Sequence, residues 1–147
     1  MLAKQEVSLM KADNMDVTIA ENKDLEYRKK IQEFYVRSKQ CKSKGFCPVQ
    51  DIMVPCSDKW SLFIIYNLAF NGVLRFNALK NYIPGVSSRM LSVSLKKLES
   101  SGIVKREVYA EVPPRVEYSL TEFGNAFSKK LLELNLWLID EHPLITH

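Results

Sequence analysis

The spacing of apolar residues predicts that the chain is mostly helical. Near the beginning, Tyr27, Ile31 and Phe34 recur at the intervals of an amphipathic helix, expected over residues 24–40 with Asp24 as its cap. The next expected elements are a break at residues 41–46 closed by Gly45, a helix that opens at Cys47-Pro48 and ends near residues 55–57, and a helix capped by Asp58. Because this third helix is apolar on nearly every side, we expect it at the centre of the core.

The middle of the chain carries the pattern of a short helix, a turn and a second helix. The short helix is expected over residues 77–82, and Pro84-Gly85 is a strong turn signal. Ser87 can cap the next helix, expected over residues 88–100, and Gly102 can terminate it. The apolar face of this helix carries Leu91, Leu95 and Leu98, and the opposite face carries Arg89, Ser92, Val93, Lys96 and Lys97.

The last part of the chain predicts a β-hairpin followed by a long helix. Residues 103–110 are rich in β-branched and aromatic types, and residues 115–120 alternate between apolar and polar. Thr121 can cap a helix that runs to about His142. This helix has more apolar surface than one small core can cover, so we expect it to contact a second chain.

The order of these elements predicts a winged helix-turn-helix fold, mainly α with a small β-hairpin, that dimerises through its terminal helices. We expect three parts: a flexible arm over residues 1–23, an N-terminal helix and linker over residues 24–46, and the winged helix-turn-helix domain over residues 47–142.

Composition limits the class of protein. The chain has 147 residues, of which 46% are hydrophobic and 26% charged, as expected for one globular domain. No apolar run approaches the roughly 18–20 residues of a membrane span, and no secretory signal is evident. Three cysteines are an odd count in an ordinary composition, which favours a reducing cytoplasm over a disulfide scaffold.

The sequence offers no enzyme chemistry of a familiar kind. The two histidines, His142 and His147, have no neighbouring nucleophile, and the chain lacks a glycine-rich phosphate loop. The cysteine spacing does not match a zinc framework. We therefore expect no catalytic residues, no metal site and no cofactor.

Positive charge is concentrated in the middle of the chain. Residues 58–120 hold nine lysines or arginines against five acidic residues, an excess of four positive charges. A nucleic-acid-binding module could show this distribution, although solvated helix faces would show it too.

An ordered set of motifs between Cys47 and Trp137 resembles the HxlR-type bacterial transcriptional regulators, relatives of the MarR-like winged helices. The motifs are Cys47-Pro48-Val49, Asp58-Lys59-Trp60, Arg75-Phe76, Ile83-Pro84-Gly85-Val86-Ser87, Arg89-Met90-Leu91, the Leu95 to Gly102 stretch, Val112-Pro113-Pro114-Arg115-Val116-Glu117-Tyr118, and Phe123-Gly124. The resemblance implies a homodimeric DNA-binding repressor or activator, often responsive to electrophiles, oxidants or small aromatic molecules. The chain departs from the family pattern at Ser57-Asp58, which replaces a glycine-rich approach to Lys59-Trp60.

The helix of residues 88–100 is the predicted DNA-reading element. Arg89 can pair bidentately with guanine in the major groove, while Ser88 and Ser92 can bind phosphate or bases. Lys96 and Lys97 are expected to contact phosphate. The alternative is an ordinary amphipathic surface helix.

The hairpin supplies further candidates for DNA contact. Arg115, just past the proline-rich tip, can reach phosphate or a minor groove, unless it forms a salt bridge with Glu117 or Glu111. Arg75, with Lys105 and Arg106, is a weaker candidate for backbone contact.

Cys47 is the candidate redox-sensing residue. It stands at a helix start, where amide dipoles favour a thiolate, and Lys42 and Lys44 are near in sequence. The resemblance also places the family's sensing thiol here. The alternative is a small buried hydrophobe, and Cys41 and Cys56 are candidate resolving partners.

Two further questions stay open at this point. The aromatic residues Trp60, Phe63, Tyr66 and Trp137 are either plain core or the lining of a pocket for a small aromatic effector. The rivals to a DNA-binding regulator are a winged-helix protein-interaction module and a small thiol enzyme that uses Cys47.

Overall fold

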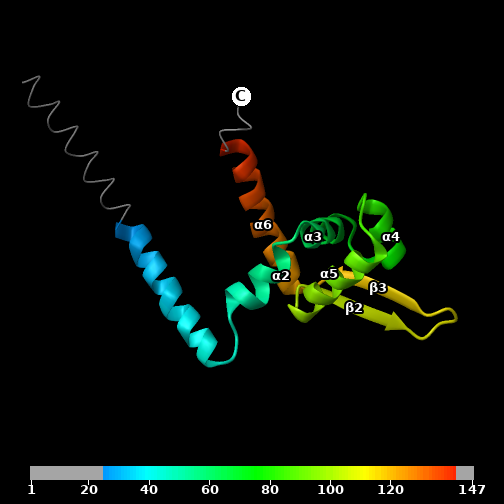
Figure 1. Ribbon diagram of the computed structural model, residues 1–147, viewed down its shortest axis with the longest axis horizontal. Coiled ribbons are helices and arrows are strands. Elements are labelled where there is room, and N and C mark those ends of the chain that lie inside the picture. The colour runs from blue at the N-terminus through cyan, green and yellow to red at the C-terminus, as the bar shows by residue number, and fades with distance from the viewer. Residues whose placement is uncertain (1–24, 142–147) are drawn as a thin grey trace, which may run out of the picture. The chain divides into compact units, whose positions relative to one another are not determined.

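A computed structural model describes residues 25–141, which divide into two compact units between Pro48 and Val49 (Figure 1). In the first unit, residues 25–43 are helical, so the predicted helix exists but the expected end at residue 40 is wrong by three residues. Gly45, with φ of 76°, ends the helix, and the Phe46 amide donates to the Cys41 carbonyl at 3.1 Å. The predicted arm over residues 1–23 and the Asp24 cap lie outside the described residues.

The second unit holds the expected order of elements, with one added strand. They are the π-helical turn η1 (Val49–Met53), α2 (Val54–Cys56), α3 (Lys59–Asn71), β1 (Leu74–Arg75), α4 (Phe76–Tyr82), α5 (Ser88–Ser100), β2 (Val104–Tyr109), β3 (Arg115–Leu120) and α6 (Glu122–Glu141). Pro48 is the first helical residue before η1, which confirms the helix start at Cys47-Pro48. The predicted end of α6 at His142 lies just outside the described residues.

The ends of α5 are set by local hydrogen bonds. The Ser87 hydroxyl accepts the Met90 amide at 3.1 Å, as an N-cap does. At the other end, Gly102 has φ of 70°, and its amide donates to Glu99 while the Ile103 amide donates to Leu98, both at 3.0 Å. This pair of bonds is a Schellman motif. The predicted range of residues 88–100 is therefore confirmed.

The core is built around α3, which contacts α2, α4, α5, α6 and β3. Its buried positions are Ser61, Ile64, Ile65 and Leu68. Other buried apolar residues come from every layer around it, and they are Cys56, Leu79, Ile83, Val86, Leu91, Leu95, Leu98, Ile103, Val104 and Leu120. The expectation that α3 lies at the centre of the core is confirmed, and one face of the helix is open to solvent, where Phe63 is 46% and Phe70 90% exposed.

The sheet has three antiparallel strands in the order β1-β3-β2. The predicted hairpin is confirmed, and its tip runs from Glu111 to Pro114 (Figure 1). Strand β1 was not expected from the sequence, because two residues are too short to show an alternating pattern. It places Leu74 opposite Tyr118 and Arg75 opposite Glu117.

The start of α6 is locked against the start of the hairpin. The Thr121 hydroxyl accepts the Gly124 amide at 2.9 Å, which confirms the predicted cap, and it donates to the Gly102 carbonyl at 2.6 Å. Gly124 is buried, and a Cβ there would collide with the Ile103 carbonyl group. Farther along, α6 leaves large apolar side chains exposed at Leu132, Leu134, Leu136, Trp137, Leu138 and Ile139. Within residues 25–141, no helix combines the length and apolar character needed to cross a bilayer.

Candidate nucleic-acid interface

Helix α5 has a buried apolar back and an exposed polar front. Leu91, Leu95 and Leu98 are at most 2% exposed and fix the helix to α3. The predicted front residues all face solvent, and they are Ser88, Arg89, Ser92, Val93, Lys96 and Lys97. The turn before α5 is also fixed, because Ile83 and Val86 are buried. A rigid helix is thus presented with serine, arginine and lysine side chains toward solvent.

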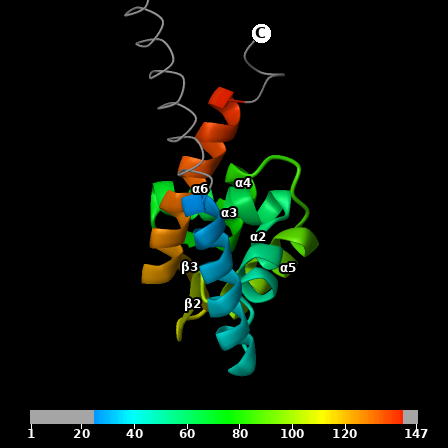
Figure 2. The ribbon, with the colours of Figure 1, turned by 90° about the vertical axis from the view of Figure 1, so that its left-hand side faces the viewer.

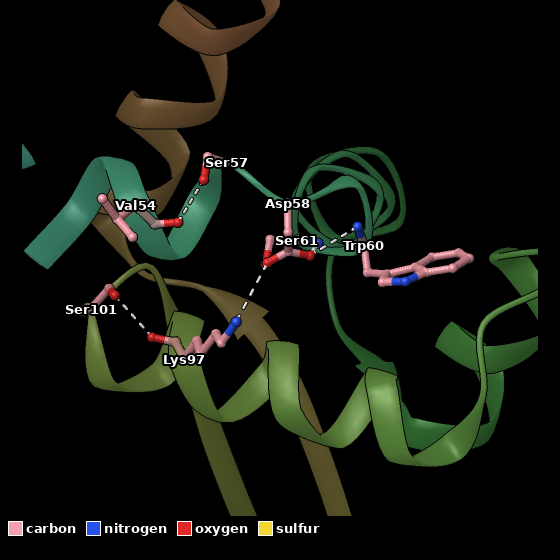
Figure 3. Close-up of polar contacts among 7 residues, drawn as sticks. All are labelled: Val54, Ser57, Asp58, Trp60, Ser61, Lys97 and Ser101. Atoms are coloured by element: carbon pink, nitrogen blue, oxygen red, sulfur yellow. Dashed lines mark hydrogen bonds and ion pairs between the residues drawn. The ribbon is translucent and has the colours of Figure 1, made fainter. Parts of the chain in front are cut away.

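Lys97 differs from the other predicted DNA-binding residues of α5. It lies about 100° farther round the helix than Lys96. Its Nζ is 4.0 Å from Oδ2 of Asp58 at the start of α3, and Figure 3 shows the side chain reaching across to that residue. Lys97 is therefore exposed like Lys96 and Arg89, with its side chain 51% accessible, and in addition forms an ion pair with the cap of the core helix.

Asp58 joins the cap of α3 to this ion pair. Its Oδ1 accepts the Trp60 and Ser61 amides at 3.0 Å each, and its Oδ2 accepts the Ser61 hydroxyl at 2.7 Å (Figure 3). Burial raises the pKa of Asp58, but the bonds from Ser61 and Trp60 and the charge of Lys97 together hold it below its ordinary value. The cap could be predicted from the sequence, whereas its pairing with Lys97 could not.

We expect Asp58 to stabilise the folded state in a pH-dependent way. Asp58→Ala should lower the free energy of unfolding by about 1 kcal/mol at neutral pH, and Asp58→Asn by less, because asparagine also caps helices. Since the folded pKa is lowered, the carboxylate's contribution is present above the ordinary pKa of 3.8 and disappears as pH falls through the folded value. Denaturant titrations of wild type and both variants over acid pH would test this. If the difference in free energy of unfolding between wild type and Asp58→Asn does not become smaller toward low pH, this expectation is wrong.

The wing brings together predicted residues from two strands. Arg115 Nη2 lies 3.1 Å from Glu111, Arg115 Nη1 lies 3.6 Å from Glu117, and its guanidinium carbon stands 4.1 Å above the Tyr109 ring. Both salt bridges that the sequence left as the alternative are present. Arg75 Nε lies 3.8 Å from the same Glu117 oxygen. Arg115 and Arg75 therefore share one carboxylate, a link that the unforeseen strand β1 creates.

All three cysteines are thiols, and one of them, Cys56, is more deeply buried than the other two. Cys56 is 3% exposed, and burial, followed by the nearby Asp58 charge, raises its pKa to about 11. Such a thiol behaves as a core residue at neutral pH. Cys41 and Cys47 are half-buried, both in the first unit, and Cys47 directly precedes the helical Pro48. The short helix α2 carries Cys56 and lies beside α5, so the buried thiol belongs to the packing that supports α5 (Figure 2).

The aromatic residues considered for an effector pocket do not share one environment. Trp60 packs against the core, while Phe63 and Trp137 are 46% and 58% exposed. Tyr66 accepts a hydrogen bond from Asn135 Nδ2 at 2.7 Å, which ties α3 to α6. Burial raises the pKa of Tyr66, and the Asn135 bond offsets part of that effect. Across residues 25–141, no group of three or more histidine, cysteine or acidic residues is placed to hold a metal ion.

The sequence of the second unit matches a known family of regulators. The HxlR-like helix-turn-helix family matches residues 56–143, more than half of the chain. The chain belongs to the HxlR family. It is a transcriptional regulator of the HxlR/MarR type, and the winged helix-turn-helix expected from the sequence is confirmed.

Relatives of this HxlR-family chain include regulators with solved structures. The uncharacterized HTH-type transcriptional regulator YybR of Bacillus subtilis is 41% identical over 95 residues, which cover 65% of this chain and 75% of YybR. The reduced form of the redox regulator HypR is 37% identical, with a TM-score of 0.59, over 67% of this chain and 97% of HypR. Diamide-treated YodB from B. subtilis is 33% identical, with a TM-score of 0.57, over 65% of this chain and 95% of YodB.

Proposed function

We propose that this HxlR-family chain is a cytoplasmic, homodimeric regulator that binds double-stranded DNA in a sequence-specific way. The observation that carries the proposal is the exposed polar front of α5 on a fixed leucine back, because the major groove admits one such helix. Arg89, near the start of α5, is suited to guanine, with Ser88 and Ser92 beside it and Lys96 toward phosphate. Arg115 and Arg75 of the wing are proposed to contact the DNA backbone.

The proposed dimer rests on apolar surface that one chain leaves uncovered. In the second unit, the last turns of α6 expose leucines, Trp137 and Ile139. In the first unit, the helix of residues 25–43 exposes Tyr27, Ile31 and Phe34. Both surfaces are amphipathic helix faces of the kind that a second copy of the chain would bury. Two α5 helices related by a two-fold axis would then read an inverted repeat.

Genomic DNA fragments offer a direct test of this function. Fragments retained by the purified protein at physiological salt should share one inverted-repeat sequence, and unlabelled copies of that sequence should compete better than unrelated DNA. Retention that unrelated DNA abolishes equally well would contradict sequence-specific binding. Failure to retain any fragment would favour a protein-interaction module instead.

We further propose Cys47 as the thiol that switches DNA binding. Support comes from its place beside a helix start and its incomplete burial, and from a redox regulator among the structural relatives. A peroxide would oxidise the Cys47 thiol to a sulfenic acid and itself be reduced to water or an alcohol; the sulfenic acid then condenses with a second thiol to a disulfide and releases water. Cys41 is better suited than Cys56 as that second thiol within a chain, because Cys56 is buried and its pKa is raised. A small electrophile would act on the same cysteine sulfur.

Replacing Cys47 with serine should remove this response. Wild-type DNA affinity is expected to change on titration with peroxide or a quinone, whereas Cys47→Ser keeps the affinity of the reduced protein throughout. Cys56→Ser is the matched control, because its buried thiol should not set the response. Binding isotherms at each oxidant concentration would measure the effect. Identical titrations of wild type and Cys47→Ser would end the redox proposal, and thiol-dependent turnover without DNA affinity would favour an enzyme.

A further inference from the structure

A largely buried carboxylate joins two arginines of the wing. One oxygen of Glu117 lies 3.8 Å from Arg75 Nε and 3.6 Å from Arg115 Nη1. Arg75 is the direct cross-strand partner of Glu117 on β1, and Arg115 stands two residues away on the same face of β3. One acidic side chain therefore holds cations from two segments that are distant in sequence.

Glu117 lies beneath the arginines that it contacts. Its side chain is 18% exposed, compared with 62% for Arg75 and 30% for Arg115. The two arginines border a groove of about 470 Å³ between the wing tip and the start of α4, which Asn77, Pro113 and Pro114 also line. Glu117 is not among the residues that line this groove, whereas Arg75, Arg115 and the acidic residue Glu111 are.

Each arginine has donor capacity beyond its ion pair with Glu117. A guanidinium carries five N–H donors in a planar fork, so it can bind one carboxylate and a second anion together. The position of Arg115 is restricted further by the Tyr109 ring. Its Nη2 lies 3.1 Å from Glu111, whose side chain is 53% exposed at the wing tip. A phosphate could replace this exposed carboxylate without displacing Glu117.

The sheet register places a second glutamate beside Glu117, so Glu117 depends on the two arginines to offset the repulsion between like charges. Glu107 on β2 is directly opposite Glu117, and like charges at such a position destabilise a sheet. Glu107 has its own partner, Lys105, at 3.3 Å. The Glu117 side chain is 18% exposed and that of Glu107 is 47% exposed. The more buried glutamate is therefore the one that is paired with the arginines.

We propose that Glu117 is a positioning residue for DNA binding, which holds Arg75 and Arg115 toward backbone phosphates at the wing groove. This inference rests on the proposed DNA-binding function. Glu117 itself touches no DNA. Its role is to fix the direction of two flexible cations before the phosphates arrive, which reduces the ordering needed on binding.

Glu117→Gln and Glu107→Gln form a matched pair of variants. Each removes one negative charge from the same sheet face, and each relieves the same repulsion between paired glutamates. If net charge alone matters, both variants bind DNA more tightly, since each lowers repulsion of phosphate. If Glu117 positions the arginines, Glu117→Gln weakens operator binding about tenfold. It also flattens the slope of log affinity against log salt concentration by about 0.9 for each phosphate that is no longer bound, and so by up to about 1.8 when both arginines lose their phosphates. Glu107→Gln keeps the wild-type slope.

Arg115→Ala in both backgrounds shows whether Glu117 acts through that arginine. It should flatten the slope in the wild type by about 0.9 and change it much less in Glu117→Gln. Thermal unfolding of each variant separates this role from a merely structural one, which would lower Tm and leave the slope unchanged. Equal slopes for Glu117→Gln and Glu107→Gln would overturn the inference. Absence of DNA binding by the wild type would instead overturn the proposed function.

Discussion

Gly124→Ala will lower the free energy of unfolding by about 3 kcal/mol, near the upper end of the usual cost of overpacking. The added Cβ would collide with the Ile103 carbonyl oxygen and lie 3.0 Å from the carbonyl carbon. That carbonyl cannot simply move aside, because it accepts the Thr121 amide at 3.0 Å. The junction between α5, the wing and α6 must therefore shift. Urea or thermal unfolding of the purified variant measures the destabilisation.

The sign of this effect separates tertiary packing from helix propensity. In an open helix, glycine to alanine stabilises by about 1 kcal/mol. Asn125→Ala, at the exposed next position of α6, is the matched control and should change stability by less than about 1 kcal/mol. A Gly124→Ala protein as stable as the wild type would show that α6 does not approach Ile103 so closely.

Arg89→Ala is expected to weaken binding to the operator by about 1–3 kcal/mol, or roughly 5- to 150-fold, and to relax the preference at one base position. The reason is that Arg89 stands exposed in the first turn of α5, the end that enters the groove in helix-turn-helix proteins. Affinities for the operator and for every single-base variant of one half-site would measure both effects.

Lys96→Ala is the control for Arg89→Ala on the same exposed front. Because Lys96 is expected to bind phosphate rather than a base, its removal should weaken binding to all sequences alike and flatten the salt slope by about 0.9. If Arg89→Ala also weakens binding uniformly, then Arg89 positions the protein and does not read a base.

Elements with local start and stop signals could be predicted from the sequence. Helix α5 has a serine cap before it and a glycine with positive φ after it, and its predicted range matches the structure. The hairpin tip is marked by its prolines. The helix of residues 25–43 was predicted too short, because the charged and polar residues after Gln40 gave no apolar spacing to continue it.

Features that depend on interactions between distant segments could not be predicted. Strand β1 exists because β3 pairs with it, and two residues carry no period of their own. The Arg75–Glu117 ion pair follows from that register. Lys97 lies on the polar side of α5 by helical geometry, yet the nearby cap of α3 places it in an ion pair. Phe70, an apolar residue near the end of α3, is nevertheless 90% exposed.

Hydroxyl-radical footprinting of the operator tests the central claim most directly, namely that two α5 helices of a symmetric dimer read the major groove. The account predicts two equivalent protected half-sites on one face of the duplex, their centres about 34 Å or one helical turn apart, at an inverted repeat. Arg89→Ala should reduce protection in both halves together. A single protected half-site, or protection without an inverted repeat, would contradict the account.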